Sequence, residues 1–112
     1  MSYRTLFVEE VARRAEADIA IADRAVIEVL TALGERLRDV DAQAVATQLP
    51  ASLAGPFLTA ARRAAPPEPS FERRIARTDP RLVRAVCRLL AERLDEQARA
   101  HLRMQPLISL FA

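Results

Sequence analysis

Residues 24–50, RAVIEVLTALGERLRDVDAQAVATQLP, and residues 81–107, RLVRAVCRLLAERLDEQARAHLRMQPL, share a pattern of apolar positions, although many individual residues differ. A shift of 57 places, from 24 to 81, aligns the two stretches without a gap. The positions that stay apolar in both copies step by three and four, which is the spacing of the buried face of a helix. The sequence therefore predicts a helical unit that occurs twice. The identical pairs include Arg24 and Arg81, Val26 and Val83, Val29 and Val86, Leu33 and Leu90, and Gln48 and Gln105.

Composition supports one compact helical domain over residues 1–112. The chain is 51% hydrophobic and 29% charged, which is typical of a globular protein, and it contains only two glycines, which leaves few tight turns. No segment alternates apolar and polar residues between turn signals, so no strand is expected. We predict an all-α fold of about seven or eight helices. They form two pseudo-repeated units, 1–63 and 70–112, joined by a linker at 64–69 that is rich in proline.

The first unit should contain four helices. A short one is expected from about Thr5 to Ala15, and a long one from an N-cap at Asp18 to about Arg38. A third should begin at Asp39 or Asp41, and a fourth should follow Pro50 and be broken at Gly55-Pro56. Gly34, inside the long helix, indicates close approach of a neighbouring helix. The expected buried positions are Leu6 or Phe7, Val11, Ala15, Ala22, Val26, Val29 or Leu30, Leu33, Leu37, Val45, Leu49, Leu53, Phe57 and Ala61.

The second unit should begin at Ser70, with Phe71 and Ile75 echoing Phe7 and Val11. Asp79-Pro80 is the clearest helix start in the chain, because a capping carboxylate precedes a proline at the first helical position. Cys87 takes the place of Leu30, which predicts a buried thiol that acts as a small hydrophobe. Leu102 should lie on a later helix. The tail, residues 106–112, either covers its own unit or packs against a second copy. The expected core stripe is Leu82, Val83, Val86, Leu89, Leu90 and Leu94.

The chain offers little catalytic or metal-binding chemistry. Its one histidine, His101, and its one cysteine, Cys87, lie fourteen residues apart, so no metal or cofactor site is expected. No nucleophile elbow and no glycine-rich phosphate loop occur. We therefore predict no catalytic residues and no enzymatic activity, and we expect His101 to be a partly exposed surface residue.

The arginines are the best functional candidates. All 17 basic residues are arginine, and eight lie between Arg62 and Arg88 against three acids, although the net charge is only +2. One interpretation is a phosphate-binding face, non-specific and salt-sensitive. The other is an ordinary solvated face on which Arg88 pairs with Glu92 four residues later. No aromatic residues interleave with this stripe, which disfavours stacking on single-stranded bases. The anion-binding candidates are Arg73, Arg74, Arg77, Arg81, Arg84 and Arg88.

Location and redox state follow from simple counts. No run approaches the roughly 20 apolar residues of a membrane span. A single cysteine cannot form an internal disulfide, and the first residues have no apolar core of signal-peptide type. The sequence favours a cytoplasmic protein without a membrane segment.

The chain resembles a bacterial family of small helical domains of unknown function, family twenty-two sixty-seven. The resemblance rests on a Phe-containing first helix, on the A-V-L and R-L pattern of residues 25–37, and on an A-x-Q-L-P hallmark at residues 46–50. A second, looser copy follows, in which Gln105-Pro106-Leu107 departs from the hallmark. The resemblance implies an all-α protein with no established activity, and it supplies no catalytic residues.

The hallmark glutamines also have a physical interpretation. Gln48 precedes Leu49-Pro50, so its amide is expected to bond backbone groups that the proline leaves unpaired. We therefore expect a non-enzymatic structural or protein-interaction module, which binds a protein partner or a second copy of itself. The alternative is weak, non-specific binding of nucleic acid or other anions through the arginine-rich face.

Overall fold

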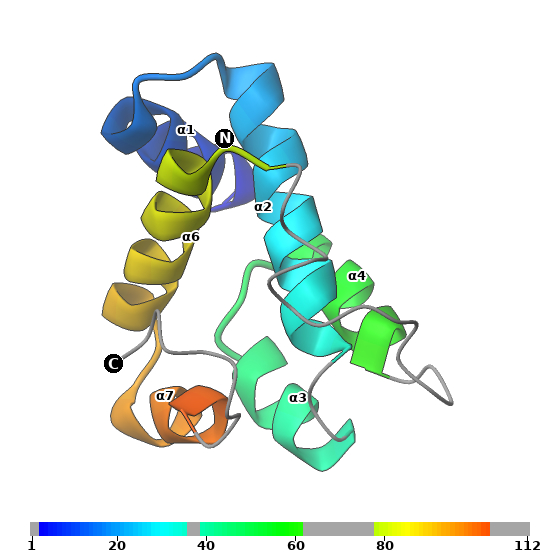
Figure 1. Ribbon diagram of the computed structural model, residues 1–112. Helices are drawn as coiled ribbons and strands as arrows, with labels where there is room; N and C mark the ends of the chain where they lie inside the picture. The colour runs from blue at the N-terminus through cyan, green and yellow to red at the C-terminus, as the bar shows by residue number, and fades with distance from the viewer. Residues whose placement is uncertain (1–2, 36–38, 62–77, 104–112) are drawn as a thin grey trace.

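The computed structural model describes residues 3–35, 39–61 and 78–103, which form six helices and no strand (Figure 1). The predicted all-α class is confirmed. The linker at 64–69, the start at Ser70 with Phe71 and Ile75, and the tail at 106–112 lie outside the described residues, so the expected seven or eight helices are not confirmed. The helices are α1 (Tyr3–Ala15), α2 (Ile19–Gly34), α3 (Asp39–Ala46), α4 (Ala51–Ala61), α6 (Pro80–Arg93) and α7 (Glu96–Arg103).

The two predicted N-caps occupy the expected positions but differ in chemistry. Asp79 precedes Pro80, and its carboxylate accepts a hydrogen bond of 2.9 Å from the Arg81 backbone N–H. Asp18 has the extended backbone of an N-cap, with φ −63° and ψ 147°, but its side chain makes no capping bond. Of these two predicted caps, only Asp79 satisfies the first turn of its helix, α6, with a side-chain hydrogen bond.

The second helix is shorter than predicted. It ends at Gly34, with Glu35 as its C-cap, and not at about Arg38. Glycine is required at position 34 because α4 packs closely against it. A Cβ at position 34 would lie 2.5 Å from the Phe57 carbonyl oxygen and 3.1 Å from the Ala60 Cβ. As the sequence indicated, another helix, α4, approaches the α2 backbone at this point more closely than any side chain permits.

The expected break at Gly55-Pro56 is wrong, because α4 continues through both residues. Pro56 lacks an N–H, so the carbonyl of Ser52, four residues earlier, loses its helical partner. Ser52 lies in the exposed first turn, where water can replace the lost bond. Gly55 has no Cβ to clash with the following proline ring, which removes the second obstacle to a helical backbone.

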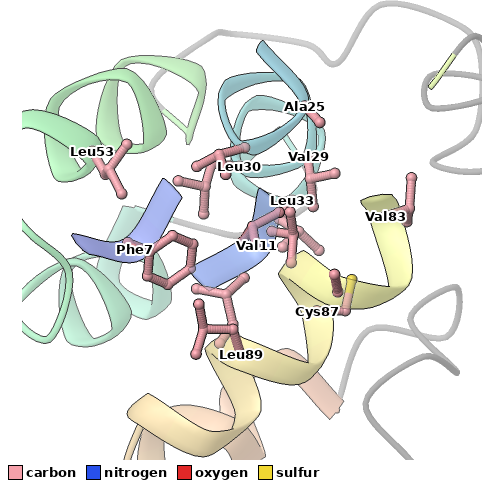
Figure 2. Close-up of a cluster of buried hydrophobic side chains, with 14 of the residues drawn as sticks. Phe7, Val11, Ala25, Val29, Leu30, Leu33, Leu53, Val83, Cys87 and Leu89 are labelled. Carbon is pink, nitrogen blue, oxygen red and sulfur yellow. The ribbon is translucent and has the colours of Figure 1, made fainter. Parts of the chain in front are cut away.

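One apolar core joins the helices from both halves of the chain (Figure 2). The Phe7 alternative is correct, since Phe7 is buried and Leu6 is 44% exposed. In α4 the third buried residue is Ala60, with Ala61 only partly covered. Val26 and Val83, which the repeat makes equivalent, are both buried. Leu37 and Leu102 fall where side chains are not described. The largest fully buried side chains are Phe57, Leu30, Leu33, Leu53, Leu89, Leu90, Val11, Val26, Val29 and Val45.

Contacts between helices fix the arrangement. Helix α2 packs against α1, α4 and α6, and α1 packs against α6 as well. Helix α3 packs against α4 and α7. The two short helices α3 and α7 lie together at the lower end of the view in Figure 1. No helix within the described ranges has both the length and the apolar character that crossing a bilayer requires.

Candidate functional site

The outward face of α6 carries the described half of the predicted anion-binding set. Arg81, Arg84 and Arg88 are exposed, opposite the buried stripe that includes Val83 and Val86. Helical spacing of three and four places these three arginines along one side of the helix. Arg73, Arg74 and Arg77 lie outside the described residues. The structure therefore brings three of the six candidates together, and their binding of anions stays a prediction.

Asp79, which precedes α6, and Glu92, near its end, both have arginine partners. Asp79 lies 3.5 Å from the Arg81 guanidinium. Glu92, the expected partner of Arg88, instead accepts a two-pronged bond from Arg14 of α1, with distances of 2.5 and 2.9 Å. Neither Arg84 nor Arg88 has an ion pair with another residue of the described ranges. The expected Arg88–Glu92 pair is therefore wrong, and both interpretations of the exposed arginines stay predictions.

Arg14 joins α1 to α6 through a small network of exposed charges. Its Nε donates to Glu10 at 2.8 Å, while its two terminal nitrogens hold Glu92. Arg13 also pairs with Glu10. Hydrogen bonds from Arg13 and Arg14 lower the pKa of the Glu10 carboxyl to about 2, and the bond from Arg14 lowers the pKa of Glu92. Sequence reasoning missed this network, although the four-residue spacing of Glu10 and Arg14 was visible.

The hallmark glutamine has a distant partner. The Gln48 Oε1 accepts a hydrogen bond of 2.6 Å from the backbone N–H of Asp95, at the start of α7. The sequence suggested a partner close to Pro50, and the observed one is 47 residues away. Hydrogen bonds from the Ala98 backbone and from the Gln48 side chain lower the pKa of Asp95. Gln48 therefore connects the two predicted units.

The described buried side chains are apolar. Every residue whose burial the structure describes as complete is apolar or glycine, and the described residues contain no cluster of metal-binding side chains. Cys87 is buried as predicted, and burial raises the pKa of its thiol to about 12. A thiol with so high a pKa is protonated at neutral pH and is a poor nucleophile. His101 belongs to α7, but its side chain is not among those described.

The start of α2 exposes an apolar run that sequence reasoning took as part of an amphipathic helix. Ile19, Ala20 and Ile21 are consecutive and all exposed, and the two isoleucines are 55% and 49% exposed. Isolated exposed aliphatic residues are common on soluble proteins, whereas three in succession at a helix start are unusual without a function.

A family model described as "Uncharacterized conserved protein (DUF2267)" matches residues 4–105. The chain belongs to the DUF2267 family. This match confirms the resemblance drawn from the sequence, and it covers most of both predicted units. No curated protein and no solved structure matches the chain.

Proposed function

We propose that this member of the DUF2267 family is a non-enzymatic structural or protein-interaction module that binds through the exposed start of α2. The exposed run Ile19-Ala20-Ile21 is the observation that carries the proposal. Burying these side chains would remove apolar surface from water, which stabilises an interface by about 25 cal/mol per Å² before association costs. The first occupant to test is a second copy of the chain.

The proposal includes an internal pseudo-repeat, supported by the way equivalent helices meet. Helices α3 and α7 have eight residues each and begin at Asp39 and Glu96, which are separated by the same 57 positions as the sequence repeat. They pack against each other, and so do α2 and α6, whose buried stripes correspond. Contact between like elements is the pattern of a twofold arrangement. Such a chain resembles a small dimer fused into one polypeptide.

Sedimentation velocity over a range of micromolar concentrations tests self-association. We expect the wild-type chain to sediment faster as its concentration rises. The double variant Ile19→Ser/Ile21→Ser should remain monomeric. Val40→Ser is the matched control, because Val40 is 78% exposed on α3 but stands apart from the run. A wild-type chain that stays monomeric at every concentration would exclude this mode of interaction.

A second candidate function is weak binding of nucleic acid through α6. The observation that favours it is the engagement of Glu92 by Arg14, which leaves Arg84 and Arg88 without an acidic partner in the described residues. Such binding would depend on phosphate contacts and would weaken steeply with salt.

Titration with duplex DNA at about 50 mM and about 200 mM salt distinguishes the two functions. Arg84→Gln/Arg88→Gln should weaken binding more than Arg24→Gln, which removes an exposed arginine from α2. No binding at the lower salt concentration, or binding that does not respond to salt, would remove this candidate.

We also propose a cytoplasmic location for the protein. The single Cys87, buried as a free thiol, supports a compartment in which disulfides are not needed for stability. Labelling the thiol after rapid denaturation of cells expressing the protein would report its redox state.

A further inference from the structure

The contact between Gln48 and Asp95 completes a helix cap across the two halves of the chain. Asp95 is the N-cap of α7, because its carbonyl accepts from the Arg99 N–H at 3.0 Å and its Oδ1 accepts from the Ala98 N–H at 2.8 Å. In a capping box, the third helical residue returns a bond to the N–H of the N-cap residue. Here that third residue is Ala98, which is buried and has no polar side chain. Gln48 supplies the returning bond instead.

The described side chains of α7 make few other contacts. The helix has eight residues, too few to be stable alone in water. Among its described side chains Ala98 is buried, and the main packing partner of the helix is α3. Arg99 donates to the Ala91 carbonyl oxygen near the end of α6 at 3.3 Å, while its Nε is buried without a partner. The second polar anchor of α7 is therefore incompletely satisfied.

Most of the described core lies outside α7. Helices α1, α2, α4 and α6 contribute nearly all of the large buried side chains, and α2 contacts each of the other three. Helix α6 ends at Arg93, and the extended backbone of Leu94 turns the chain directly into the cap of α7. The Leu94 corner is thus a natural hinge between the interlocked core and a lightly held helix.

We propose that Gln48 is a latch that holds α7 against α3, and that release of this latch lets α7 open as a unit while the α1–α2–α4–α6 core stays folded. Opening would separate α7 from α3 and would expose Ala98, which is buried in the closed state. The latch joins the hallmark element of the first unit to the last described helix of the second. It operates separately from the exposed start of α2.

Hydrogen exchange measured by mass spectrometry on the whole chain tests the latch. In Gln48→Ala, amides of residues 94–103 should exchange about two- to tenfold faster, the range expected for loss of one hydrogen bond. Exchange in α2 and α6 should not change. Gln48→Asn shortens the side chain by one methylene and should give the same local pattern if Gln48→Ala folds poorly.

Two further variants separate the latch from a general loss of stability. Thr47→Ala is the control, since the Thr47 hydroxyl donates to the Ala44 carbonyl at 2.9 Å within the first unit. It should leave residues 94–103 unchanged. Gln48→Glu combined with Asp95→Asn keeps an acceptor on each residue without opposing two carboxylates, and should restore slow exchange. Unchanged exchange of residues 94–103 in Gln48→Ala, or equal acceleration throughout the core, would overturn the proposal.

Discussion

Glu16 stands immediately after the last residue of α1 in the left-handed region of backbone space, with φ 53°. The N–H of Ala17 bonds the carbonyl of Ala12 at 2.9 Å, and the N–H of Glu16 reaches that of Arg13 at 3.4 Å. This pair of bonds is the Schellman ending of a helix, which glycine fills best because it has no Cβ. A glutamate at this position stores conformational strain.

Replacing this residue should therefore stabilise the protein. We expect Glu16→Gly to raise the free energy of unfolding by about 0.5–1 kcal/mol, the relief of left-handed strain less the added freedom of the unfolded chain. Urea denaturation measures the change. Glu16→Ala removes the same charge but keeps the Cβ, so it should give little or none of the gain. Equal stabilisation by both variants would assign the effect to charge.

At Gly34, in contrast, adding a Cβ should destabilise the protein, because the Cβ would clash with the backbone of α4. Gly34→Ala should lower the free energy of unfolding by about 1–3 kcal/mol, because α4 must move away from its contact at the Phe57 carbonyl. Alanine would otherwise favour a helix by about 1 kcal/mol. Thr59→Ala is the control, since Thr59 is exposed on the same helix and its replacement adds no atom. Similar midpoints for both variants in urea would contradict the proposed close contact.

At the scale of the helix, the ion pairs of Glu10 within α1 should make the stability of the protein depend on pH. The pKa of Glu10 falls from 4.5 to about 2 on folding, chiefly through hydrogen bonds from Arg13 and Arg14. A carboxyl with a depressed pKa contributes its full stabilisation above its unfolded pKa and loses it as the pH falls through the folded value. The contribution of Glu10 should therefore decline between about pH 4.5 and pH 2.

Comparison with Glu10→Gln isolates this contribution. The difference in urea midpoint between the wild type and the variant should be constant above about pH 5 and should shrink toward pH 2. Added salt should also reduce it, because these side chains are exposed to solvent. Glu9→Gln, on the same helix, is the control. A difference that does not vary with pH would show that Glu10 acts without its charge.

Individual helices were predictable where local chemistry decides them. The pair Asp79-Pro80 predicts a helix start from local chemistry alone. The buried stripe that includes Val83 and Val86 follows from the helical spacing of the apolar residues. The continuity of α4 was not predictable, because it depends on the exposure of the Ser52 carbonyl. The partners of Glu92 and Gln48 were hidden for a related reason. Each lies more than forty residues away in sequence, on a helix whose placement follows from packing.

At the scale of the whole molecule, the core crosses the boundary between the two predicted units. Helix α6 of the second unit packs on α1 and α2 of the first, and residues of all three helices belong to one apolar cluster. Neither half can keep these faces buried without the other. Repetition in the sequence therefore does not imply two independently folding parts.

This shared core predicts one cooperative transition. Val26 and Val83 correspond in the predicted repeat and are 0% and 4% exposed, so Val26→Ala and Val83→Ala should each cost about 1.5–3 kcal/mol. In calorimetry, both variants should lower the midpoint of the same single peak by several degrees. Two resolved peaks, each sensitive to one variant only, would show that the halves unfold separately. Coincident circular-dichroism and calorimetric midpoints in both variants would instead establish that the duplicated pattern builds a single folding unit.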